Sequence, residues 1–162
     1  MTTRSPADGD RAALAARTSE EVLADHLRLR RSGDLEADLR RNYDPQLVVL
    51  TAREVFRGHD GLRASAHRLW KALGDGSSYR YTYALADDRM ALLEWSGSDE
   101  DVRVRCGVDS YLIEEGWIRV QTIHYRVEDV ALSTDGDLLA GTPHPGVHRV
   151  DDPDRKSELT DG

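Results

Sequence analysis

Asp109 and His26 are the residues whose types and settings in the sequence best suit acid–base chemistry. Asp109 falls in a predicted strand, where the alternation of side chains puts it on the same face as Arg105 and Tyr111. A buried carboxyl group with few cations nearby has a raised pKa, and such a group can act as an acid or base near neutral pH. The alternative is an ion pair of Asp109 with Arg105 or Arg103, which would lower this pKa instead.

His26 lies on the apolar stripe of the first long predicted helix, which follows Thr18 and opens with the capping-box sequence TSEE. A histidine that faces a pocket can carry protons or orient a ligand, whereas a core histidine is bonded to a backbone group. Glu94 would lie opposite Arg105 across a turn, where it would either polarise the pocket or form an ion pair. Both Glu94 and Arg105 are therefore candidates for binding a ligand.

Four further residues are candidates for contact with a ligand. If the hairpin register turns Asp109 inward, Gln121 and Tyr125 on the next strand share its face and would orient the ligand. Tyr43 and Trp70 would add aromatic contacts, although such residues belong to a core more often than to a site. A shift of the register by one residue would exchange the inward and outward side chains of this hairpin.

The bulk properties of the chain argue against several classes of function. Its 162 residues suit one domain, and a net charge of −8 argues against nucleic acid or an anionic membrane as the main partner. The single cysteine, Cys106, permits no disulfide within the chain, and no apolar run approaches the ~20 residues of a membrane span, so we expect a cytoplasmic protein. No spacing of His, Cys, Asp and Glu fits a metal site and no glycine-rich phosphate loop is present, so we expect no metal and no cofactor.

The elements that would position these residues occupy one predicted domain, residues 18–132. We expect residues 1–17 to form a flexible arm and residues 133–162 to form an acidic, disordered tail. Between them, helices should follow Thr18, Asp34 and Gly58, and strands should cover 46–51, 54–57, 79–85, 89–96, 102–113 and 117–126. This order predicts an α+β fold in which helices cover one face of a curved antiparallel sheet.

The other face of the central strand is apolar and has no predicted helix left to cover it. Its side chains are Val102, Val104, Cys106, Val108, Ser110 and Leu112, and Leu93 and Trp95 should extend it on the neighbouring strand. An exposed apolar surface of this size usually marks an interface. We therefore expect a symmetric homodimer that forms through this face.

The order of these elements resembles the nuclear transport factor 2-like superfamily, and within it the branch of the SnoaL-like polyketide cyclases and ketosteroid isomerases. The matching stretches are SGDLEADLRRNYDPQLVV, VFRGHDGLRASAHRLW and GVDSYLIEEGWIRVQTIHY, and the resemblance covers residues 18–126. It implies a cone-shaped, cystatin-like α+β barrel, in which a curved antiparallel sheet wraps around three N-terminal helices above a pocket. It also implies a dimer through the convex face of the sheet.

The resemblance assigns roles to single residues. Asp109 matches the carboxylic acid with which ketosteroid isomerases bind the substrate oxyanion, and His26 matches the tyrosine that shares this task. Thr51 occupies the position of the isomerase's base, and a threonine cannot take a proton from carbon at neutral pH. The last strand also lacks the carboxylate of related epoxide hydrolases. SnoaL-type cyclases use an acid in the pocket, and Asp109 could serve as one.

Two functions follow from the resemblance. The first is a small-molecule-binding protein that acts as a cofactor-free isomerase, cyclase or dehydratase, using acid–base chemistry on an apolar carbonyl or hydroxyl compound. The second is a non-catalytic ligand-binding or dimeric assembly module of the same fold, which the missing base at Thr51 favours. An open apolar cavity containing Asp109 and His26 would favour chemistry, whereas a closed or salt-bridged cavity would favour the module.

Overall fold

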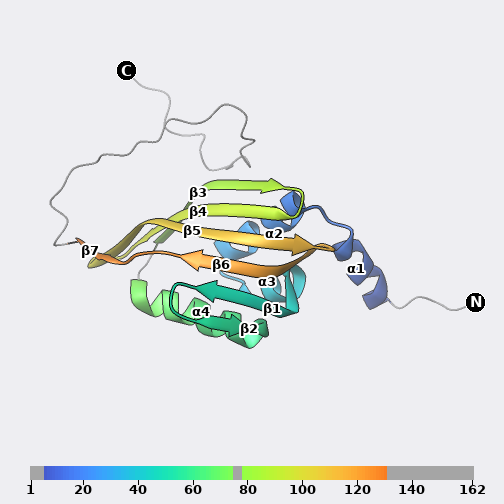
Figure 1. Ribbon diagram of the computed structural model, residues 1–162, viewed down its shortest axis with the longest axis horizontal. Coiled ribbons are helices and arrows are strands. Elements are labelled where there is room, and N and C mark those ends of the chain that lie inside the picture. Colours follow the sequence, from blue (N-terminus) through green and yellow to red (C-terminus); the bar gives the residue numbers. More distant parts are fainter. Residues whose placement is uncertain (1–5, 75–77, 131–162) are drawn as a thin grey trace, which may run out of the picture.

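A curved, unclosed sheet lies against a layer of helices in the computed structural model, which describes residues 6–74 and 78–130 (Figure 1). The helices are α1 (Pro6–Ala15), α2 (Ser19–Arg31), α3 (Leu35–Asn42) and α4 (Gly58–Leu73). The strands are β1 (Tyr43–Thr51), β2 (Val55–Arg57), β3 (Ser78–Asp87), β4 (Met90–Ser98), β5 (Val102–Glu114), β6 (Trp117–His124) and β7 (Glu128–Asp129). Helix α1 falls in the stretch predicted as a flexible arm, and the predicted tail, residues 133–162, lies outside the described residues.

The sheet runs in the order β2-β1-β6-β5-β4-β3, and β7 pairs with β5. Strands β3 to β6 form an antiparallel meander, because a short turn joins each of them to the next. These features confirm the predicted α+β fold with its curved sheet. The difference is that β1 pairs with β6 in parallel, while β2 pairs with β1 in the antiparallel sense. None of the helices in the described part of the chain is long and apolar enough to cross a bilayer.

Helix α2 presents His26 to the inner face of the sheet. The predicted capping box holds its first turn: the Glu21 N–H donates to Thr18 Oγ1 (3.2 Å), and the Thr18 N–H donates to the Glu21 carboxylate (2.8 Å). The stripe that follows buries Val22 and Leu23 completely, and His26 lies one turn further along the same side. Burial of this stripe therefore fixes the direction in which His26 points.

Helix α3 packs on α2 and brings an acidic side chain, Asp38, to His26. Asp34 caps the helix by accepting a hydrogen bond from the Ala37 N–H (2.9 Å), and Asp38, one turn later, is fully buried. The helix ends at Asn42, where β1 begins without an intervening loop.

Strand β5 contains a bulge at residues 105 and 106. Trp95 pairs with Gly107 and Gly97 pairs with Val104, so β5 has one residue more than β4 between these two pairs. Residues 105 and 106 are both exposed, which means that two consecutive side chains lie on the outer side. Alternation of inward and outward side chains is therefore interrupted within the strand.

This bulge makes part of the predicted alternation wrong. Val104 is only 1% exposed and Val102 packs against the core, although strict alternation predicts both for the outer face. Arg105 lies on the outer side, whereas the prediction places it in the pocket with Asp109. Beyond the bulge, Asp109 is buried on the inner face.

Leu93 and Trp95 also face inward, which corrects their predicted place on the outer face. Leu93 pairs with Asp109 and Trp95 pairs with Gly107, and residues paired across two strands share a face of the sheet. Gly107 allows Trp95 to lie against the backbone, because a Cβ at this position would come within 2.2 Å of the indole ring. Glu94 alternates with these residues and therefore lies on the outer side.

Candidate functional site

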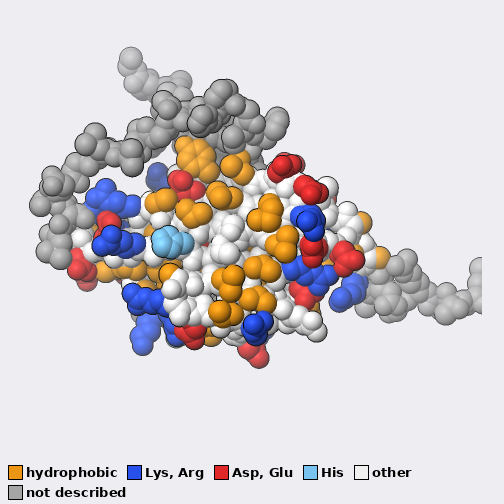
Figure 2. All heavy atoms as spheres, in the orientation of Figure 1, with side chains coloured by type: hydrophobic (Ala, Val, Ile, Leu, Met, Phe, Trp, Pro, Cys, Tyr) orange, Lys and Arg blue, Asp and Glu red, His pale blue; other side chains and the backbone are white. Residues whose placement is uncertain are grey.

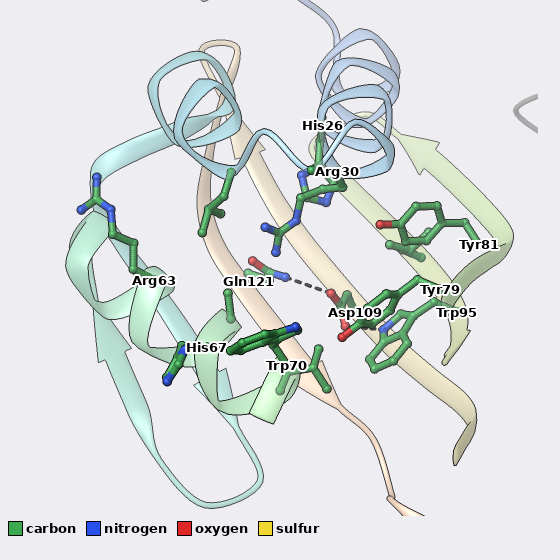
Figure 3. A pocket seen from close by; sticks show the side chains of 15 residues that line it. His26, Arg30, Arg63, His67, Trp70, Tyr79, Tyr81, Trp95, Asp109 and Gln121 are labelled. Carbon is green, nitrogen blue, oxygen red and sulfur yellow. Dashed lines mark hydrogen bonds between the residues drawn. The ribbon is translucent and has the colours of Figure 1, made fainter. Parts of the chain in front are cut away.

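A pocket of about 450 Å³ lies between the helices and the inner face of the sheet (Figure 3). Its walls are mostly apolar and aromatic, and they include Leu69 and Trp70 of α4, Tyr79 and Tyr81 of β3, and Leu93 and Trp95 of β4. Its polar side chains are His26 and Arg30 of α2, Arg63 and His67 of α4, Asp109 of β5 and Gln121 of β6. A cavity of this size with a few convergent polar groups is typical of a small-molecule site.

Asp109 is buried on the inner face of the sheet and is held by three hydrogen-bond donors. Its Oδ1 accepts from Trp95 Nε1 (2.9 Å), and its Oδ2 accepts from Gln121 Nε2 (2.9 Å) and from the Tyr111 hydroxyl (3.2 Å). Burial raises the pKa of Asp109, although the hydrogen bonds from Trp95 and Gln121 act to lower it. One lone pair on Oδ1 stays available to carry a proton or to meet a ligand.

The alternative reading of Asp109 as half of an ion pair is wrong. Arg105 Nε lies 3.2 Å from Glu128 and Arg103 Nε lies 3.8 Å from the same carboxylate, so both arginines pair with β7. Among the described residues, Asp109 forms no salt bridge. The site therefore contains a buried carboxyl group whose proton affinity is increased.

Burial of Asp109 predicts that protein stability depends on pH. Because its folded-state pKa lies above 3.8, the ordinary value, the folded protein keeps this proton to a higher pH than the unfolded chain does. Wild-type protein should therefore lose stability relative to the Asp109→Asn variant as the pH rises from about 4 through the raised pKa. Urea unfolding of both proteins over a series of pH values measures this difference. A stability difference that does not change with pH would contradict the shift.

His26 is fixed in the pocket by a buried carboxylate. Its Nδ1 lies 2.9 Å from Asp38 Oδ2, and the other oxygen of Asp38 accepts a hydrogen bond from Asn42 Nδ2 (2.9 Å). This contact sets the orientation of the imidazole and commits Nδ1 to Asp38. The remaining nitrogen, Nε2, lies 3.3 Å from the Tyr111 hydroxyl.

Tyr111 connects His26 with Asp109, because its hydroxyl is within hydrogen-bond distance of both. Burial raises the pKa of Tyr111 well above its usual value, so this side chain is a neutral phenol with one proton to donate. If the phenol donates to Asp109, a bond to His26 needs a proton on Nε2. If it donates to His26 instead, a bond to Asp109 needs a proton on the carboxyl group. The arrangement can therefore pass a proton between Asp109 and His26.

Gln121 is oriented from behind by Tyr43. The Tyr43 hydroxyl donates to Gln121 Oε1 (2.9 Å), which turns the amide NH₂ of Gln121 toward Asp109. Tyr43 itself is completely buried and does not line the pocket, so its predicted contact with a ligand is wrong. It supports a pocket residue instead.

Three other predicted ligand contacts also need correction. Tyr125 does not line the pocket; its ring lies 5.8 Å from that of Trp95, which does. Arg105 is on the outer side of the sheet because of the bulge, and Glu94 is there because its neighbours Leu93 and Trp95 face inward. Trp70 does line the pocket (Figure 3), and 45% of its surface is exposed.

Sequence analysis did not single out Arg30 or Asp38. Arg30 lies four residues after His26, and this spacing puts both side chains on the same side of a helix, so the signal was present. Asp38 gave no such signal, because its contact with His26 depends on how α3 packs against α2. In the described ranges, no group of three or more His, Cys, Asp and Glu side chains is placed to bind a metal ion.

Comparison with known proteins gives matches in structure but not in sequence. No protein-family model matches the chain, and no curated protein matches it. Among solved structures, an NTF2-like protein of unknown function from Burkholderia xenovorans aligns with a TM-score of 0.55 and 19% identity, over 71% of this chain and 84% of that protein.

Two further solved structures share the architecture. A protein from Mesorhizobium loti, provisionally assigned as a SnoaL-like polyketide cyclase, aligns with a TM-score of 0.51 and 20% identity, over 67% of this chain and 100% of its own. TerC, which was co-crystallized with polyporic acid, aligns with a TM-score of 0.55 and 13% identity, over 65% of this chain and 89% of its own. At these identities the likeness concerns the fold.

Proposed function

We propose that this chain, which has the nuclear transport factor 2-like fold, binds a small, mostly apolar molecule and carries out cofactor-free acid–base chemistry at its carbonyl or hydroxyl oxygen. The observation that supports this proposal most is the position of Asp109. Among the described residues it is the one carboxyl group that lines the pocket, and it is buried there among aromatic side chains. The likeness to TerC and to a SnoaL-like protein also supports a pocket for small molecules.

Asp109 would act first on the ligand's oxygen. In its protonated form it donates a hydrogen bond or a proton from Oδ1, while Trp95 and Gln121 hold the carboxyl group in place. In an enolisation, Nε2 of His26 would accept the proton that leaves the neighbouring carbon while the Tyr111 hydroxyl donates to Asp109. Tyr111 would then return a proton from His26 to Asp109, which restores both groups for the next turnover.

Deuterium exchange tests this proposal without knowledge of the natural substrate. A panel of two-ring aromatic ketones, such as 2-tetralone, is incubated with the protein in D₂O, and loss of the α-proton signal is followed by NMR. The proposal predicts faster exchange with wild-type protein than with buffer for those ketones that bind. Ketones that bind without faster exchange would contradict the catalytic role of the pocket.

A non-catalytic ligand-binding or assembly module is the second candidate, and Thr51 favours it. The Thr51 hydroxyl donates to the Glu54 carbonyl (2.9 Å) and accepts from the Glu54 N–H (3.0 Å), so it closes a turn and does not line the pocket. The position at which related isomerases carry a base is therefore structural here. This module would bind the same ketones as the enzyme but would leave their exchange rate unchanged.

We also propose that a second copy of the chain covers the outer face of the sheet. Hydrophobic side chains gather over this face (Figure 2). Strand alternation places Met90 and Leu92 there, 52% and 38% exposed, and Leu112 is paired to Met90 on the next strand. The proposed contact is smaller than the sequence alone indicated, since Val104 and Trp95 face inward. An apolar surface on a sheet is a usual place for a symmetric dimer.

The Leu92→Asp variant should disrupt this dimer, because it would place two carboxylates in a symmetric apolar contact. Light scattering should give twice the chain mass of 18.1 kDa for wild-type protein and the single mass for the variant. The Leu92→Ala variant, which stays apolar, is the control and should keep the higher mass. A monomeric wild-type protein at micromolar concentration would exclude the dimer.

A further inference from the structure

Arg30 is a pocket cation whose hydrogen-bond donors are largely uncommitted. It projects from α2 into the pocket (Figure 3), and about a quarter of its side chain is exposed. Its Nε lies 3.6 Å from Asp38 Oδ2, which is close enough for an ion pair but too long for a hydrogen bond. Within the described ranges, no residue accepts a hydrogen bond from its guanidinium group.

Arg63 provides a contrast on the same pocket. Its Nε and Nη2 donate to the Glu36 carboxylate (2.7 and 2.8 Å), and its Nη1 donates to Asp60 (2.6 Å). The charge of Arg63 is therefore balanced by two acids at the surface, whereas Arg30 shares a single acid that already bonds to His26 and Asn42. Of these two arginines, Arg30 is the one with donors left for a ligand.

The surroundings of Arg30 select the kind of group that it can bind. A guanidinium group presents paired N–H donors that match the two oxygens of a carboxylate. Trp70, Tyr81 and Trp95 line the same cavity, and aromatic walls suit a flat apolar body. In its protonated form, which the proposed chemistry uses, Asp109 adds no negative charge to the cavity.

We infer that the ligand of this pocket is an aromatic or polycyclic acid, whose carboxylate Arg30 binds while its ring system lies between the aromatic walls. This inference rests on the proposed function and adds the charge of the ligand to it. Arg30 of α2 and Asp109 of β5 both line the pocket, so one ligand can meet both side chains. The chain has a net charge of −8, so this preference for an anion is a local property of the pocket.

Two matched probes test the inference: 2-naphthoate, which has a carboxylate, and 2-naphthamide, which has the same ring system without the charge. Trp70 and Trp95 line the pocket, so tryptophan fluorescence reports binding of either probe. Wild-type protein should bind the acid at least about tenfold more tightly than the amide. The Arg30→Gln variant should lose this preference and bind the amide within about twofold of wild type. The Arg28→Gln variant is the matched control and should keep the preference, because Arg28 lies on the same helix but donates to Asp25 and does not line the pocket.

Several outcomes would overturn the inference. These are equal binding of acid and amide to wild-type protein, a preference that survives in Arg30→Gln, and no binding of the acid. If Arg30→Gln does not fold, Arg30→Lys replaces it: the paired donors are lost and the preference should shrink, whereas an unchanged preference would count against Arg30. Equal binding of both probes would leave the pocket and its acid–base role in place, because deuterium exchange of neutral ketones tests those separately.

Discussion

The Asp109→Asn variant is expected to lose about 10²- to 10⁴-fold of the rate at which wild-type protein exchanges the α-protons of a bound ketone. An asparagine amide can donate a hydrogen bond but cannot give up a proton at neutral pH, so the ligand oxygen would lose its acid. Its carbonyl can still accept from Trp95 Nε1, which keeps that wall of the pocket in place. NMR exchange rates with and without the substitution measure the effect.

The control for this experiment is Asp60→Asn. Asp60 is a fully exposed aspartate of α4, so its replacement should leave the exchange rate unchanged. Binding of the ketone and near-ultraviolet circular dichroism show whether the Asp109→Asn variant is folded and competent to bind. A folded Asp109→Asn variant that exchanges the ketone at the wild-type rate would remove Asp109 from the mechanism.

The Asp38→Ala variant is expected to lower the free energy of unfolding by about 3–5 kcal/mol. Asp38 is fully buried and accepts from His26 Nδ1 and Asn42 Nδ2, so alanine would leave two buried polar groups without a partner. The substitution would also remove the negative charge that lies beside the Arg30 guanidinium group. Urea unfolding monitored by tryptophan fluorescence measures the loss.

Asp60→Ala serves as the control for this loss of stability, because it removes an exposed aspartate whose one hydrogen-bond partner among the described residues is Arg63. Its unfolding midpoint should stay close to that of wild type. A decrease below about 1 kcal/mol for Asp38→Ala would mean that His26 is held in the pocket by packing rather than by this carboxylate.

Local sequence signals were sufficient for helices α2, α3 and α4, though not for α1, and for the inward side of the last hairpin. The capping box after Thr18 and the apolar stripe beyond it predicted where His26 would point, because both depend on residues within one helix. The placement of Asp109, Tyr111 and Gln121 on one face of the sheet followed from period-two alternation in two strands joined by a short turn.

Signals that depend on distant partners were not readable from the sequence. The extra residue in β5 is defined by its pairing with β4, and a single strand read alone shows no break at Arg105 and Cys106. Counting by twos backward from Asp109 therefore put Val104 on the wrong face and Arg105 in the pocket. The parallel pairing of β1 and the contact of Asp38 with His26 likewise depend on tertiary packing.

The bulge in β5 also determines how the strand can change in length. Residues 105 and 106 both lie on the outer side, so deletion of either would leave Val104 and Gly107 facing inward and would give the strand a regular alternation. A deletion between Gly107 and Ile113 would instead reverse the faces on one side of the gap and turn Asp109 or Tyr111 outward. β5 thus contains one dispensable position, whose loss would flatten the strand but preserve the set of side chains that faces the pocket.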